Sequence, residues 1–175
     1  MITIISGSLR VENNTKKVAS VYYDVLQKKN IDVQLLSLDE VNVFERHADF
    51  IVMEKQYLIA ADAFIIVMPE YNGSYPGILK LMIDNSDVAK CWHHKKVLLT
   101  GVSTGRAGNL RGMEHLSGSL MHMKMLVHPN RLPISMVDKL LDENQHLSDA
   151  GTLKAINSQL DEFLKFSGVV SNEMV

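Results

Sequence analysis

The sequence has a single cysteine, Cys91, and it lacks long apolar runs. One cysteine cannot form an intramolecular disulfide, which suits a protein of a reducing compartment. No stretch approaches the ~18 apolar residues that a membrane-spanning helix needs, and no leader-like segment precedes the first predicted strand. We therefore expect a cytoplasmic protein that does not contact a membrane.

Neither positive nor negative charge is in large excess. The net charge is −2, with no run of Lys or Arg and no basic patch interleaved with aromatic residues. Such a chain has no long-range field that attracts nucleic acid, so we expect no nucleic-acid partner. A length of 175 residues, 46% of them hydrophobic and 22% charged, predicts one globular domain over residues 1–175.

The motifs of several large enzyme classes are missing. There is no dinucleotide fingerprint G-x-G-x-x-G, no P-loop G-x(4)-G-K-[ST] and no nucleophile elbow G-x-S-x-G. His115 and His122 are about 10 Å apart along a predicted helix, too far to share one zinc ion, and His93-His94 has no matching Cys or Asp. Cys91 lacks support as a nucleophile, and Glu70 is more simply a loop carboxylate oriented by backbone than a general acid–base. We predict no metal site and no catalytic side chain.

The most informative stretch that is present is Ala63–Lys80. Its apolar run Ala63–Met68 predicts a strand buried on both faces, as in a parallel sheet. Pro69 ends the strand, and the Asn72-Gly73 pair that follows tolerates positive φ, which predicts a tight loop. An apolar helix face begins soon after. Strand, tight loop and helix together form a typical ligand-binding corner of an open α/β sheet.

A second loop, Gly7–Thr15, lies between the predicted strand Ile2–Ser6 and a helix that begins near Thr15. A turn of this kind collects unpaired backbone N–H groups at the positive end of the helix dipole. Further donors are the hydroxyl, amide and guanidinium groups of Ser8, Arg10, Asn14 and Thr15. We expect these residues to hold the terminal phosphate of a mononucleotide. Taken alone, the same residues are equally consistent with an ordinary helix-capping turn.

The remaining elements follow from apolar periodicity. Further strands are predicted at Val33–Leu38, Lys96–Val102 and Met125–His128, and helices at 49–61, at Leu110–Met123 and after a capping Ser148. Loops are expected at Arg131–Pro133 and Asp142–Gln145. A third glycine-bearing loop, Ser103–Gly108, follows the strand Lys96–Val102.

Three segments resemble one family. The segment PEYNGSYPG-x-LK, from Pro69 to Lys80, resembles the flavin-binding loop of NADPH-dependent FMN reductases, which include quinone, azo-dye and chromate reductases. The loop Gly7–Thr15 resembles their G-S-x-R-x-x-S-x-N/T phosphate loop, with Asn13 where serine is usual. Ser103 begins a segment similar to their S-x-G-x-x-G-G, with Asn109 in place of the second glycine. The resemblance covers roughly residues 3–129.

The resemblance implies a flavodoxin-like α/β domain, a five-stranded parallel sheet in the order 2-1-3-4-5 with helices on both faces, that binds FMN. Hydride would pass from NAD(P)H through FMN to a quinone, azo compound or similar acceptor, in a homodimer or homotetramer. By this resemblance, the phosphate would be held by Ser8, Arg10, Asn14 and Thr15. The edge of the flavin ring would be met by Pro69, Glu70, Tyr71, Asn72 and Gly73. The other side of the ring would be bordered by Ser103, Gly105 and Gly108.

Two alternatives stay open. The chain could be a non-enzymatic electron carrier of the flavodoxin type, although its ring loop is not that of flavodoxins. It could also be a regulatory protein that has lost flavin, and the departures at Asn13 and Asn109 favour this reading. The sequence does not specify the acceptor or choose between NADH and NADPH.

Overall fold

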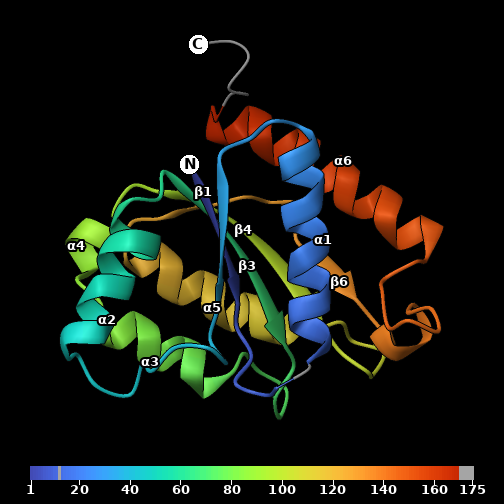
Figure 1. Cartoon of the computed structure of the whole chain (residues 1–175), viewed down its shortest axis with the longest axis horizontal. Coiled ribbons are helices and arrows are strands. Elements are labelled where there is room, and N and C mark those ends of the chain that lie inside the picture. Colours follow the sequence, from blue (N-terminus) through green and yellow to red (C-terminus); the bar gives the residue numbers. More distant parts are fainter. Residues whose placement is uncertain (12, 170–175) are drawn as a thin grey trace.

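A computed structural model describes residues 1–11 and 13–169, and its central element is a parallel β-sheet (Figure 1). The strands run in the order β2-β1-β3-β4-β5, as predicted, and a sixth strand also pairs with β4. The strands are β1 (Ile2–Ser6), β2 (Val33–Ser37), β3 (Ala63–Pro69), β4 (Lys96–Val102), β5 (Leu126–Val127) and β6 (Leu132–Ile134).

Helices cover both faces of the sheet. The helices are α1 (Asn14–Lys28), α2 (Ala48–Met53), α3 (Gly77–Asn85), α4 (Val88–Cys91), α5 (Leu110–His122) and α6 (Ala150–Ser167). Helices α1 and α6 lie against one face, and α2 to α5 lie against the other (Figure 1). In the part of the chain that the structure describes, no helix combines the length and the apolar character needed to cross a membrane.

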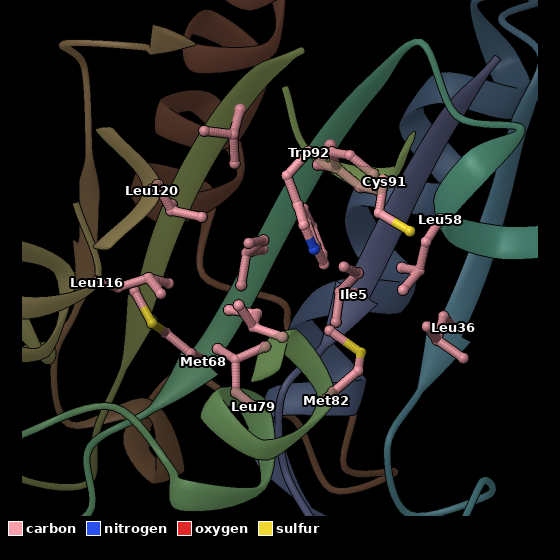
Figure 2. Close-up of a cluster of buried hydrophobic side chains, with 14 of the residues drawn as sticks. Ile5, Leu36, Leu58, Met68, Leu79, Met82, Cys91, Trp92, Leu116 and Leu120 are labelled. Atoms are coloured by element: carbon pink, nitrogen blue, oxygen red, sulfur yellow. The ribbon is translucent and has the colours of Figure 1, made fainter. Parts of the chain in front are cut away.

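Alternating side chains of the central strands enter two separate cores. In β3, Phe64, Ile66 and Met68 pack with α2 to α5, whereas Ile65 and Val67 pack with α1 and α6. Figure 2 shows the first core, with Trp92 and Met68 among helix residues such as Leu79 and Leu116. The unbroken apolar run of β3 is therefore buried on both faces, as the sequence predicted.

The edge of the sheet beyond β4 differs from the prediction. The expected strand Met125–His128 is reduced to β5, and the expected loop Arg131–Pro133 falls largely within the strand β6. In the gap between them, Gln159 Nε2 in α6 donates to Leu99 O at 3.2 Å and to Asn130 O at 2.8 Å. The predicted last strand is thus shortened, and a further strand pairs with β4 where a loop was predicted.

One helix start and one helix interior also differ. Asp149, not Ser148, caps α6, because its Oδ2 accepts from Thr152 N–H at 2.7 Å. The helix predicted over 49–61 is α2 followed by a π-helical turn, Glu54–Ile59. The wider π turn rotates the inward face, so that Leu58 is fully buried and Tyr57 only partly.

The π turn begins with a buried carboxylate, Glu54, held by groups from two other segments. Arg46 Nη1 and Nη2 donate to Glu54 Oε1 and Oε2 at 2.6 and 2.8 Å, and the Asp87 N–H donates to Oε1 at 2.6 Å. Burial by itself raises the pKa of Glu54, but the hydrogen bonds from Arg46 and Asp87 outweigh it and lower the pKa below its ordinary value. The ionised carboxylate therefore ties the loop before α2 to the turn between α3 and α4.

We predict that Glu54→Gln lowers the free energy of unfolding by about 1–3 kcal/mol at neutral pH, because an amide replaces a carboxylate that accepts several short hydrogen bonds. The folded-state pKa lies below the unfolded value of about 4.3, so the stabilisation is present above that value and is lost as the pH falls through the folded-state pKa. Urea unfolding of both proteins from about pH 6 to about pH 3 should show the difference shrinking. A constant difference would contradict the role given to Glu54.

Candidate functional site

A cavity of about 270 Å³ lies where the loops after β1, β3 and β4 meet. The three strands are parallel neighbours, with Ser6 opposite Val67 and Pro69 opposite Val102, so their carboxyl ends share one edge of the sheet. Eight of the predicted site residues line the cavity: Ser8, Arg10, Asn14, Thr15, Pro69, Glu70, Tyr71 and Ser103. Four do not: Asn72, Gly73, Gly105 and Gly108.

Helix α1 begins at this cavity. Asn13 is its N-cap, and the Asn13 Oδ1 accepts from Lys16 N–H at 2.7 Å. The N–H groups of Asn14 and Thr15 find no hydrogen-bond acceptor among the described residues. The cavity wall therefore carries free donors at the positive end of a helix dipole, the arrangement that binds a phosphate group. Asn13, which the sequence placed in doubt, works as the cap of this helix.

Arg10 and Tyr71 connect the first and second loops across the cavity. The Arg10 guanidinium lies 4.8 Å from the centroid of the Tyr71 ring, and the Tyr71 hydroxyl is 3.1 Å from Ser8 Oγ. Ser8 Oγ also accepts from Arg10 N–H at 3.2 Å. In the described part of the chain, Arg10 forms no ion pair, so its positive charge is not neutralised by a carboxylate.

The residues after Glu70 form a tight hairpin. Tyr71 and Ser74 exchange backbone hydrogen bonds of 2.9 and 3.1 Å, and the two residues at the tip have positive φ, 52° at Asn72 and 75° at Gly73. Two consecutive residues of this kind define the Asn-Gly turn that the sequence predicted. The turn faces α5, because a Cβ on Gly73 would lie 2.9 Å from Arg111 Nη1. The tip therefore borders the site without lining its cavity.

Asn109 joins the carboxyl end of β3 to the start of α5. It is fully buried, with φ 59°, and its Nδ2 donates to Met68 O at 3.2 Å and to Pro69 O at 2.8 Å. Its backbone N–H donates to Glu70 Oε2 at 3.2 Å. Glu70 is thus a loop carboxylate oriented by backbone, the simpler of its two readings, and Asn109 holds the second loop against the third.

The third loop is closed by its own serine. Ser103 Oγ donates to Gly105 O at 2.9 Å and accepts from Gly108 N–H at 2.9 Å. Gly108 has φ 55°, and its carbonyl oxygen lies 2.1 Å from where a Cβ on Gly101 would be. Ser103 and Gly108 therefore shape the loop, whereas Gly105 is exposed beside it.

The cavity wall includes residues that sequence reasoning missed. They are Val11, Val102, Thr104 and Val137, and Asn13, whose contact the sequence left in doubt, also lines the cavity. Val137 lies in the segment after β6, and its N–H donates to Ser103 O at 3.0 Å. No local sequence pattern predicts that it lines the cavity. Among the described residues no cluster of three or more His, Cys, Asp or Glu could hold a metal ion. The site offers phosphate-binding donors, one tethered carboxylate and backbone loops.

Known proteins resemble the chain in sequence and in fold. The family model for NADPH-dependent FMN reductases matches residues 1–138. A 2-hydroxy-1,4-benzoquinone reductase of a Burkholderia species is 25% identical over 171 residues, 93% of either chain. An NAD(P)H-dependent FMN reductase of Pseudomonas aeruginosa is 32% identical over 111 residues, 61% of this chain and 59% of that one. The structure of FerB, a flavoenzyme NAD(P)H:(acceptor) oxidoreductase of Paracoccus denitrificans, has a TM-score of 0.76 at 20% identity and covers 95% of this chain and 96% of its own.

We predict that Asn109→Gly destabilises the protein by about 1–2 kcal/mol, because two side-chain hydrogen bonds are lost while positive φ is kept. Asn109→Asp should cost more, about 2–4 kcal/mol at neutral pH, since a carboxylate would face two carbonyl oxygens beside Glu70. Urea unfolding measures both. Lys124→Gly is the matched control, because Lys124 is an exposed residue with φ 61° at the end of α5. Destabilisation by the control alone would contradict the role of Asn109.

Proposed function

The chain belongs to the NADPH-dependent FMN reductase family, and we propose that it binds FMN in the cavity at the carboxyl ends of β1, β3 and β4. Hydride would then pass from NAD(P)H to a quinone, azo compound or similar acceptor. The observation that carries the proposal is the Arg10 guanidinium and the N–H groups at the start of α1, which have no acceptor or carboxylate partner among residues 1–11 and 13–169 and lie next to the family's ring loop.

The donor set fits the phosphate of FMN. A phosphate monoester carries a charge of about −1.5 to −2 near neutral pH. The N–H groups of Asn14 and Thr15 have no acceptor among the described residues, and the Arg10 guanidinium has no carboxylate partner there. We propose that these groups hold the phosphate, with Ser8 joining them once its hydroxyl turns away from Tyr71.

The flavin ring would lie between the second and third loops. Pro69 to Gly73 would meet its edge largely through backbone groups, and Ser103, Gly105 and Gly108 would border it on the other side. The cavity of about 270 Å³ is near the lower end of the roughly 300–1,000 Å³ of most small-molecule sites. We propose a homodimer or homotetramer in which a second copy completes the wall.

When bound, FMN accepts hydride from the nicotinamide and delivers it to the acceptor. The residues of this chain supply position and electrostatics. Arg10 and the start of α1 would anchor one end of the cofactor, and Asn109 keeps the ring loop in place through Met68 O and Pro69 O. Glu70 is held by Asn109 N–H, so we assign it a structural rather than a proton-transfer role, and no side chain is proposed as catalytic.

Partners and location follow from the same reading. We propose one domain over residues 1–175, with a small-molecule acceptor and no nucleic acid as partner. The one cysteine, Cys91, is buried beside Glu54, and burial raises its pKa to about 12. An unpaired thiol kept in its protonated form fits a reducing compartment, and we propose the cytoplasm.

We predict that the protein retains FMN through gel filtration and that NAD(P)H alone bleaches the flavin absorbance. With a quinone as second substrate, initial rates should give parallel double-reciprocal lines, because one site serves both substrates in turn. Absorbance spectra and steady-state kinetics test this. A flavin that stays oxidised with either nucleotide would indicate an electron carrier, and a colourless protein after incubation with excess FMN would indicate a flavin-free homologue.

We predict that Arg10→Ala weakens FMN binding about ten- to a hundredfold, since a charge-assisted hydrogen bond is worth roughly 1.5–3 kcal/mol and each 1.4 kcal/mol is tenfold. Arg10→Lys should lie between, because it keeps the charge and loses the planar fork. Riboflavin has no phosphate and should bind all three proteins almost equally. Fluorescence titrations at fixed salt measure the affinities, and equal losses for FMN and riboflavin would remove Arg10 from the phosphate site.

A further inference from the structure

Lys17 lies behind the phosphate-binding wall, and its hydrogen-bond partners among the described residues are neutral. Its Nζ donates to Asn14 Oδ1 at 3.2 Å and to Gln145 Oε1 at 3.0 Å. Within residues 1–11 and 13–169 it forms no ion pair, whereas its neighbour Lys16 contacts two carboxylates, Asp39 at 3.4 Å and Glu40 at 2.5 Å. No carboxylate in those residues therefore cancels the charge of Lys17.

The contact with Lys17 decides which end of the Asn14 amide is free. A lysine ammonium has three donors and no acceptor, so only the oxygen of an amide can face it. Asn14 lines the cavity, and nothing among the described residues accepts a hydrogen bond from its Nδ2. The end of Asn14 left for a ligand is thus a donor, the polarity that a phosphate requires.

Lys17 is also held in place by a residue that is distant in the sequence. Gln145, in the loop before α6, accepts from its ammonium and has φ 64°. Lys17 and Gln145 line a surface hollow of about 610 Å³ that shares Asn13 with the cofactor cavity. Its other described lining residues, Lys16 and Ser20, include no carboxylate. A row of polar contacts thus runs from Gln145 through Lys17 to Asn14.

Resting on the proposed function, we propose that Lys17 is a positioning residue for the phosphate of FMN. It binds the Oδ1 of Asn14 and so fixes the amide with Nδ2 presented to the phosphate. The donors that line the hollow beside Lys17 would also suit a second phosphate monoester, the 2′-phosphate of NADPH. We assign Lys17 to the flavin because Asn14 lines the flavin cavity and Lys17 contacts Asn14 directly.

The test is titration of FMN and riboflavin into wild type, Lys17→Met, Asn14→Ala and the double variant. Each single variant should weaken FMN about three- to tenfold, the range of one hydrogen bond, and leave riboflavin unchanged. Because Lys17 acts through Asn14, the double variant should lose little more than Asn14→Ala alone. Lys17→Arg should restore FMN affinity to near the wild-type value.

A matched control is Lys28→Met, at the other end of α1, where the same loss of charge should leave FMN affinity unchanged. Equal weakening of FMN and riboflavin by Lys17→Met, or losses that add in the double variant, would overturn the proposal. So would an unchanged FMN affinity with a changed ratio of kcat/KM for NADPH and NADH, which would assign Lys17 to the nucleotide. A wild type that binds FMN no better than riboflavin would instead refute the phosphate site itself.

Discussion

The geometry of the site depends on the contacts of one buried amide, that of Asn109. Its Nδ2 binds the last two carbonyl oxygens of β3, and its N–H binds the carboxylate of the next residue, Glu70. The loop after β3 and the first turn of α5 are therefore a single unit. Nothing else in the described residues joins these segments through so many hydrogen bonds. At this family position, which usually has glycine, the asparagine side chain makes two of these three hydrogen bonds.

The residues around the cavity divide between shaping the loops and binding a ligand. Ser103 and Gly108 shape the third loop, and Asn13 caps α1. Those functions occupy their polar groups, so a ligand meets mainly what remains: Arg10, the amide of Asn14 and the N–H groups of the first helical turn. In the proposed function the flavin would supply the chemistry and the loops would supply its position.

The sequence by itself determined the sheet and the placing of the loops. Apolar runs such as Ala63–Met68 and Lys96–Val102 specify buried parallel strands, and parallel strands place their following loops at one edge. The Asn72-Gly73 turn was also predictable, because positive φ at both residues is a local preference. The position of the loop Gly7–Thr15 was also predictable, since it follows one strand and leads into one helix.

Only the tertiary structure decided which of those residues face the cavity and what holds them there. Asn109 reaches Met68, and Val137 reaches Ser103, across segments far apart in the sequence. The gap between β5 and β6 is bridged in the same way by Gln159, which donates from α6 a hydrogen bond to Leu99 O. Periodicity and turn preferences act over a few residues, whereas these contacts are set by how helices pack on the sheet, so no local pattern could reveal them.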